Sequence, residues 1–211
     1  GVDTRALTRR LRISGVMMGT VTHDETPEQA LARLRDLPRY GATDLVPLVS
    51  TREAYTYVGS RPGASVAGWR PEQAVLHGGE PRRRIVVVDL GVKYNILRVL
   101  SRLGCEAVAV PCDTAWEDIL AMRPDGVLLS PGPGDPALLD YAVASARGLV
   151  GKTPMMGICL GHQVLGSVFG AKSYKLKFGH RGANHPVRDE ATGRVYVTAQ
   201  NHGYAIDDAG L

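Results

Sequence analysis

The chain has 211 residues, of which 44% are hydrophobic and 22% charged, with a net charge of +4. These values are typical of a folded globular protein with one large or two small domains, and they argue against intrinsic disorder. Since no apolar stretch approaches the ~20 residues that span a bilayer, and residues 1–12 lack the apolar segment of a signal peptide, we expect a cytoplasmic protein without membrane binding.

Before residue 80, the sequence predicts two helices and an apolar run. The first helix covers residues 4–12, and the apolar run covers residues 16–21. The second helix begins at Thr26, which can cap a helix that has Pro27 in its first turn, and it ends near Pro38. Because the chain opens on a capped helix without an initiator methionine, we expect the natural protein to extend further in that direction.

Residues 59–84 are rich in glycine, proline and arginine, which predicts a linker or loops that cross between domains. This segment ends in three consecutive arginines, Arg82, Arg83 and Arg84. We expect them at the solvated entrance of a strand rather than in contact with a nucleic acid or an acidic partner.

From residue 85, short apolar runs alternate with helical patterns. The runs predict strands at residues 85–88, 107–110, 127–129 and 155–158. The helices between them are predicted at residues 96–103, 114–122 and 138–150, the second of which opens on a capping box from Thr114 to Glu117. This alternation predicts an α/β fold with a doubly wound, mostly parallel sheet, in which ligands bind at the carboxyl ends of the strands.

A lone thiol lies between two glycines where the fourth strand gives way to the next helix. Gly157 and Gly161 flank Cys159 at the spacing that a sharp strand-to-helix turn requires. At such an elbow the thiolate lies beside the positive end of the helix, and the next backbone N–H is placed to hold an oxyanion. The pattern predicts acyl transfer through a thioester.

The chain has three cysteines, and their odd number without short paired spacing fits a reducing compartment better than a disulfide scaffold or a zinc site. An isolated cysteine in an apolar run is usually a core residue. Cys105 and Cys112 lack flanking glycines, so we predict a structural role for both.

Two further segments each have a structural and a functional interpretation. Residues 130–136 follow the third strand and contain Pro-Gly-Pro-Gly, which is either a rigid turn or a loop whose N–H groups complete an oxyanion hole. Residues 200–204 follow a strand predicted at residues 195–198. Their composition alone favours a polar turn.

Residues 157–163 resemble the nucleophile motif of class I glutamine amidotransferases, and residues 130–134 resemble the oxyanion loop of that family. Other segments resemble one member of it, the small subunit of carbamoyl phosphate synthetase. These segments are residues 2–12, 89–98, 177–187 and 199–205. The resemblance covers essentially the whole chain. It implies that residues 1–80 are the carboxyl-terminal part of the small subunit's amino-terminal domain plus a linker, and that residues 81–211 are the glutamine amidotransferase domain.

The resemblance implies that Cys159 attacks the side-chain amide of L-glutamine, that ammonia leaves, and that water releases glutamate from the thioester. The N–H groups of Gly132 and Leu160 would hold the oxyanion. Residues implied to position glutamine are Gly134, Gln163, Asn201, Gly203 and Tyr204, with His202 as a support. The implied partner is a large synthetase subunit, which makes carbamoyl phosphate from bicarbonate and ATP with a divalent metal. No cofactor or metal is expected in this chain.

One part of the family pattern is missing from the sequence. The general base of the family is a histidine in a His-Pro-Glu motif, and no such motif occurs here; His185-Pro186-Val187 lacks the carboxylate. We therefore expect a fragment lacking both ends that by itself hydrolyses glutamine poorly or not at all. Activity equal to that of the complete subunit would make one of four histidines the base, namely His162, His180, His185 or His202.

Three other functions remain open at this point. The first is the glutaminase of another amidotransferase, since the elbow is common to all of them, although residues 1–80 argue against it. The second is a hydrolase of γ-glutamyl or peptide bonds, which uses the same Cys-His chemistry and releases its product to water. The third is a catalytically silent binding subunit. For the synthetase, both arginine and pyrimidine biosynthesis remain possible.

Overall fold

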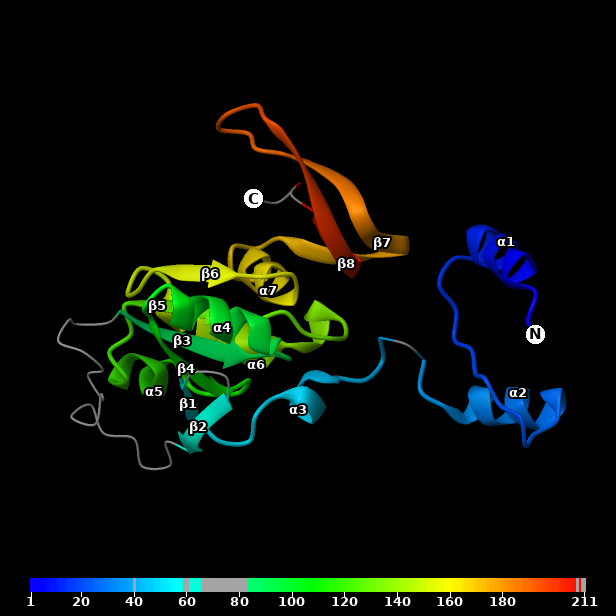
Figure 1. Ribbon diagram of the computed structural model, residues 1–211, viewed down its shortest axis with the longest axis horizontal. Coiled ribbons are helices and arrows are strands. Elements are labelled where there is room, and N and C mark those ends of the chain that lie inside the picture. The colour runs from blue at the N-terminus through cyan, green and yellow to red at the C-terminus, as the bar shows by residue number, and fades with distance from the viewer. Residues whose placement is uncertain (40, 59–60, 66–82, 208, 210–211) are drawn as a thin grey trace. The chain divides into compact units, whose positions relative to one another are not determined.

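The computed structural model describes residues 1–39, 41–58, 61–65, 83–207 and 209 (Figure 1). Its contacts divide the chain into two compact units. The smaller unit comprises Gly1–Thr43 and Ser173–Asp207, and the larger unit is built from Asp44–Lys172. The predicted domain boundary near residue 80 and most of the predicted linker lie outside the described residues, so the division into residues 1–80 and 81–211 stays a prediction.

The described residues of the larger unit contain a six-stranded sheet with the order β2-β1-β4-β3-β5-β6. The strands are β1 (Tyr55–Val58), β2 (Arg61–Ser65), β3 (Arg84–Asp89), β4 (Glu106–Pro111), β5 (Gly126–Leu129) and β6 (Met155–Gly157). Strands β3 to β6 run parallel, whereas β1 is antiparallel to β4 and β2 is antiparallel to β1. The four strands predicted from the apolar runs are confirmed, and so is the mostly parallel α/β sheet.

Two strands at the sheet edge were not predicted. β2 falls inside the segment predicted as a linker, and β1 precedes it. The linker prediction is therefore wrong for residues 61–65. The glycine and proline in β2 do not indicate a strand in the sequence. They are tolerated here because β2 is an edge strand, which needs hydrogen bonds on one side only.

Helices cover both faces of the sheet, as the doubly wound prediction requires (Figure 1). They are α3 (Val46–Val49), α4 (Tyr94–Arg102), α5 (Trp116–Ala121), α6 (Asp140–Leu149) and α7 (Leu160–Val168), with a 3-10 turn at Pro136–Leu138. On β3, Val86 and Val88 pack with α5, α6 and α7, and Val87 packs with α4. The alternation along one strand shows that each face has its own apolar core. Among the described helices, none has the length and apolarity needed to cross a bilayer.

The capping box predicted from Thr114 to Glu117 is wrong. The N-cap of α5 is Ala115, which makes no side-chain capping bond. The Thr114 hydroxyl instead donates to the carbonyl oxygen of Pro111, at 2.8 Å. This bond closes the turn between β4 and α5. The hydroxyl therefore bonds the last residue of β4 and does not cap α5.

Arg84 is buried, so the solvated position expected for it is wrong; Arg83 is exposed as predicted, and Arg82 lies outside the described residues. The register of β3 and β4 places Arg84 opposite Glu106. Nε of Arg84 lies 2.7 Å from Oε2 of Glu106, with side-chain exposures of 10% and 17%. Nη1 of Arg84 also donates to the carbonyl oxygen of Met122, at 2.7 Å. The guanidinium thus ties together the amino-terminal ends of two strands and the end of α5.

Replacement of Arg84 by methionine is expected to lower the free energy of unfolding by about 2 kcal/mol. Methionine keeps the apolar part of the side chain, but Glu106 loses its cationic partner while it is largely shielded from solvent. Breaking a fully buried pair costs about 3–5 kcal/mol, and this pair is slightly more exposed. Arg188→Met is the matched control, since Arg188 pairs with Glu190 at side-chain exposures of 64% and 76%. Its effect should stay below about 0.5 kcal/mol. Equal shifts of the two variants in urea titrations would contradict the prediction.

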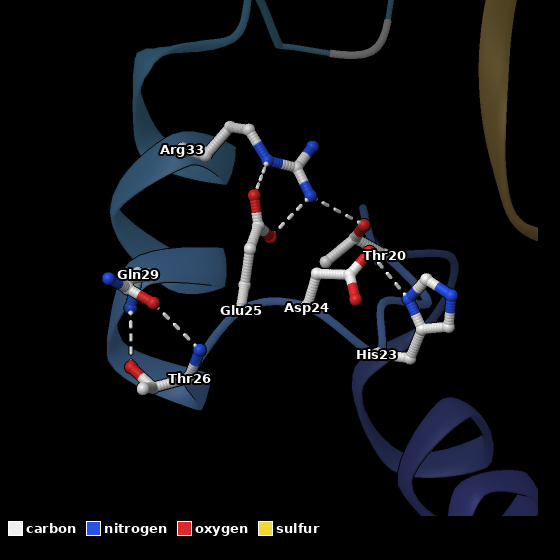
Figure 2. Close-up of polar contacts among 7 residues, drawn as sticks. All are labelled: Thr20, His23, Asp24, Glu25, Thr26, Gln29 and Arg33. Carbon is white, nitrogen blue, oxygen red and sulfur yellow. Dashed lines mark hydrogen bonds and ion pairs between the residues drawn. The ribbon is translucent and has the colours of Figure 1, made fainter.

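The smaller unit contains α1 (Thr4–Ser14), α2 (Pro27–Asp36) and a hairpin of β7 (Lys172–Arg188), except for its first residue, and β8 (Val195–Asp207). Both predicted helices are confirmed. Figure 2 shows the start of α2, where the N–H of Thr26 donates to Gln29 Oε1 and the N–H of Gln29 donates to Thr26 Oγ1, at 2.9 and 3.3 Å. The pair is a capping box, with Pro27 in the first helical turn. The cap predicted at Thr26 is confirmed, and the bond between Thr26 and Gln29 adds to it.

Residues 200–204 lie within β8, so the polar turn favoured by their composition is wrong. Cross-strand contacts hold them against β7. Arg181 donates to Asn201 Oδ1 at 2.7 Å, and a ring nitrogen of His180 lies 3.0 Å from one of His202. The polar side chains pair across a hairpin, a type of long-range contact that composition does not report.

Candidate active site

Cys159 lies at a sharp turn between β6 and α7. It is the N-cap residue of α7, with φ 53° and ψ −108°. Among the described residues, only Arg123 is another non-glycine residue with positive φ. Such a backbone conformation costs about 1–3 kcal/mol, and it persists only where the surrounding structure imposes it. The Cys159 side chain is exposed, so the strained turn presents the thiol to solvent.

The two flanking glycines are required by close backbone approaches. A Cβ on Gly157 would overlap the Gly161 carbonyl group, and a Cβ on Gly161 would overlap the carbonyl group of Leu129 in β5. The glycines therefore let α7 start directly against two parallel strands. The elbow geometry predicted from the glycine spacing is present.

The Pro-Gly-Pro-Gly loop leaves β5 next to this elbow. A Cβ on Gly132 would overlap the Leu90 carbonyl oxygen and would lie 2.8 Å from the Leu160 side chain. Gly134 has φ +95°, a left-handed conformation that favours glycine. Three separate segments thus meet at one place, namely the turn after β3, the loop after β5 and the first residue of α7.

The meeting point is the topological switch of the sheet. From β3 the chain passes through α4 to β4 on one side, whereas β5 and β6 follow on the other side. Connections that leave neighbouring strands in opposite directions open a crevice at their carboxyl ends, where ligands of α/β proteins bind. The turn after β3 and the loop after β5 form the two sides of this crevice, and Cys159 follows the adjacent strand.

The start of α7 includes a backbone donor without a partner inside the helix. The N–H of Gly161 bonds the Ile158 carbonyl and the N–H of Gln163 bonds the Cys159 carbonyl, at 3.0 and 3.1 Å. The N–H of Leu160 belongs to the first helical residue and has no acceptor within the helix. Since helix N-termini favour negative charge, this end of α7 suits an oxyanion that forms beside the thiol.

The structure distributes the predicted site residues over both units. Cys159, Gly132, Gly134, Leu160 and Gln163 lie in the larger unit, around the switch point. The other three lie on β8 in the smaller unit; they are Asn201, Gly203 and Tyr204. Their place around a bound substrate stays a prediction.

The candidate bases also fall in both units. His162 lies on α7 and is exposed. His180, His185 and His202 lie on the β7–β8 hairpin, where Nδ1 of His202 is 2.7 Å from the Tyr204 carbonyl oxygen. Within the described ranges, no group of three or more His, Cys, Asp or Glu residues is placed to ligate a metal ion.

Two buried side chains beside the loop had no predicted role of their own. Ser130 is fully buried; its Oγ accepts from the Leu90 N–H and donates to the Pro131 carbonyl oxygen, both at 2.9 Å. Asp89 is 4% exposed and accepts from the N–H groups of Thr51, Gly91 and Val92. The sequence could have indicated a role for both residues, because each is a polar residue at the carboxyl end of an apolar strand. Ligands of α/β proteins bind at this edge of the sheet.

Alkylation with iodoacetamide is expected to modify Cys159 first, Cys105 more slowly and Cys112 last. Cys159 is exposed, Cys105 is half-buried and Cys112 is buried. Burial also raises the pKa of the Cys112 thiol, so a smaller fraction is thiolate at neutral pH. Time-resolved mass spectrometry of the modified peptides checks this order. Modification of Cys112 at the rate of Cys159 would contradict the described packing.

Comparison with known proteins agrees with this geometry. Residues 86–211 match the family glutamine amidotransferase class-I. The chain is 43% identical to the carbamoyl phosphate synthase small chain of Polynucleobacter necessarius, over 98% of this chain and 54% of that protein. It is 44% identical to the small chain of Methanopyrus kandleri, over 100% of this chain and 54% of that protein. The chain thus spans about half the length of the curated relatives it matches.

Among solved structures, the chain is similar to a Thermoplasma acidophilum protein described as part of a GMP synthase. The TM-score is 0.53 at 25% sequence identity, and the similarity covers 62% of this chain and 69% of that chain. This similarity supports the α/β fold of the larger unit.

Proposed function

The chain belongs to the class I glutamine amidotransferase family, and we propose that it is the glutamine-hydrolysing part of a carbamoyl phosphate synthase small chain. The observation that carries the proposal is the strained Cys159 elbow at the switch point, with the Gly132 loop packed on Leu160. The choice of family member rests on carbamoyl phosphate synthase small chains, whose alignments cover 98–100% of this chain at 43–44% identity.

The proposed reaction begins when the Cys159 thiolate attacks the side-chain amide carbon of glutamine. A C–S bond forms and the carbonyl π electrons move to the oxygen, which the N–H groups of Gly132 and Leu160 stabilise. The oxyanion collapses, the C–N bond breaks, and the nitrogen takes up the proton that the thiol had given up and leaves as ammonia. Water then attacks the thioester carbon and forms a second oxyanion; the C–S bond breaks, one water proton passes to the sulfur, and glutamate and the free thiol are released.

The remaining predicted residues are proposed to hold the substrate. Gln163 and Asn201 suit the α-amino and α-carboxylate groups of glutamine, because these small charged groups need fixed hydrogen-bond partners. The buried position of Gln163 supports a fixed orientation of its amide. Gly134, Gly203 and Tyr204 complete the proposed set.

The proposed partner is a large synthetase chain in the cytoplasm. It receives the ammonia and joins it with bicarbonate, using ATP and a divalent metal, to form carbamoyl phosphate. The carbamoyl phosphate then supplies arginine or pyrimidine biosynthesis. In this scheme the present chain contributes the thiol and the oxyanion donors.

The test uses the complete protein with its synthetase partner. Supplied with glutamine, bicarbonate and ATP, the complex is expected to release glutamate and carbamoyl phosphate in equal amounts. γ-Glutamyl peptides serve as competing substrates and should be poor ones. Rapid hydrolysis of those peptides, with ammonia lost to solvent and no response to the synthetase, would replace the proposal by a γ-glutamyl hydrolase.

A further inference from the structure

We propose that Ser130 is a positioning residue for the oxyanion step, whose hydroxyl fixes the orientation of the peptide between Pro131 and Gly132. This inference rests on the proposed function, since it assigns the Gly132 N–H to the developing negative charge. Ser130 itself does not touch the substrate in this scheme. It acts through one peptide group.

Both hydrogen-bonding roles of the hydroxyl are taken up. Ser130 is fully buried, and its Oγ accepts from the Leu90 N–H at 2.9 Å. A hydroxyl has one proton to donate, and at Ser130 it goes to the Pro131 carbonyl oxygen, also at 2.9 Å. The hydroxyl thus accepts a bond from the turn after β3 and donates a bond to the loop after β5.

The Pro131 carbonyl and the Gly132 N–H belong to the same peptide group. The described residues contain no cis peptide bond, so these two groups point in opposite directions across one plane. A bond that holds the carbonyl toward Ser130 therefore directs the N–H away from Ser130. Rotation of the peptide by half a turn would break this bond and would aim a carbonyl dipole where the N–H dipole had been.

Glycine at position 132 makes such a rotation sterically accessible, because its backbone tolerates most φ and ψ combinations. Gly132 is required by the close approach of the Leu90 carbonyl. Position 132 thus requires glycine, and glycine by itself does not fix the orientation of the peptide that precedes it. The Ser130 hydroxyl supplies the missing restraint on that peptide.

The anchor on the other side of Ser130 is itself held by hydrogen bonds. The Leu90 turn is held by Asp89, whose Oδ1 accepts from Gly91 and Val92 at 2.9 and 2.7 Å. The backbone N–H of Ser130 itself donates to the Val88 carbonyl of β3, at 3.1 Å. The Ser130 hydroxyl therefore connects the loop after β5 to the carboxyl end of β3. Through this connection, the hydrogen bonds at the end of β3 hold the peptide between Pro131 and Gly132 in one orientation.

The test compares Ser130→Ala with Ser145→Ala in the complete protein with its partner. Ser145 is also buried, and its hydroxyl donates to a backbone carbonyl, that of Thr114, at 2.9 Å. Removal of a whole oxyanion donor costs about 10²–10³ in kcat, so a mispositioned donor should cost about 10-fold to 100-fold. Ser130→Ala is expected to lower kcat for glutamine by that factor with KM unchanged within about 2-fold, and Ser145→Ala to leave both unchanged.

A second readout is the binding of an aldehyde analogue of glutamine. Cys159 adds to the aldehyde carbon, and the resulting tetrahedral alkoxide occupies the oxyanion position. Its affinity should fall in Ser130→Ala by the same factor as kcat, and it should not change in Ser145→Ala. Should the alanine variant fail to fold, Ser130→Cys preserves the side-chain shape with a weaker donor, and we expect an intermediate loss of kcat at constant KM.

The outcomes separate the two proposals. Absence of glutaminase activity in the unmodified complex would reject the proposed function. An active unmodified complex in which Ser130→Ala behaves like Ser145→Ala, or raises KM alone, would overturn the role of Ser130. Full kcat in Ser130→Cys, if the alanine variant does not fold, would also overturn it.

Discussion

Replacement of Cys159 by alanine is expected to lower glutamine-dependent activity of the complete protein at least about 10³-fold, because no thioester can form without the nucleophile. The exposed thiol at the strained turn lies beside the loop that is proposed to complete the oxyanion hole. Glutamate release from glutamine measures the loss directly. With ammonium chloride in place of glutamine, carbamoyl phosphate synthesis by the partner should continue, since the steps after ammonia release do not require this thiol.

Cys105→Ala is the matched control for the nucleophile. Cys105 is a free, half-buried cysteine beyond the end of α4 and lacks flanking glycines. Its replacement should change kcat by less than about 2-fold. Glutaminase activity that survives in Cys159→Ala, or a loss that ammonium chloride does not relieve, would contradict the assigned role of the thiol.

Replacement of Gly161 by alanine is expected to destabilise the larger unit by at least about 3 kcal/mol and to abolish glutaminase activity. In a helix this substitution normally stabilises by up to about 1 kcal/mol, so helix propensity alone predicts the opposite sign. At Gly161 the added Cβ would overlap the Leu129 carbonyl group, and backbone atoms of a central strand cannot yield as a flexible side chain does. The start of α7 must then shift, and Cys159 shifts with it.

Thermal unfolding followed by circular dichroism measures this effect, and the midpoint should fall by about 6–12 °C. Gly19→Ala provides the comparison, because a Cβ at Gly19 would meet no atom within 4 Å. That variant should unfold within about 2 °C of the parent protein. A Gly161→Ala variant that is as stable and active as Gly19→Ala would show that α7 does not depend on this close approach.

The strands and helices of the larger unit could be predicted because their signals are local. Residues 85–88 are four consecutive β-branched apolar residues, and they form the interior of β3, which is buried on both faces. The elbow could be predicted from two glycines at fixed spacing, each of which meets a backbone carbonyl group in the fold. The start of α2 was visible because Thr26, a residue type that caps helices, directly precedes Pro27 in the first helical turn.

Other features escaped prediction because their partners are distant in the sequence. Arg84 was expected in solvent, but Glu106, 22 residues later, accepts its Nε–H. Thr114 had the right spacing for a capping box, yet the turn after β4 takes its hydroxyl. Residues 200–204 had the composition of a turn, and pairing with β7 makes them part of a strand.

The sequence alone determined the strand-to-helix elbow, since two glycines that flank a thiol at a strand end specify this turn through backbone sterics within a few residues. Only the tertiary structure decided how that elbow is supported. The hydroxyl of Ser130 bonds a backbone group 40 residues away, and the carboxylate of Asp89 bonds one 38 residues away. These contacts arise when parallel strands bring their carboxyl ends to one edge of the sheet, and no local pattern encodes which buried polar groups then meet.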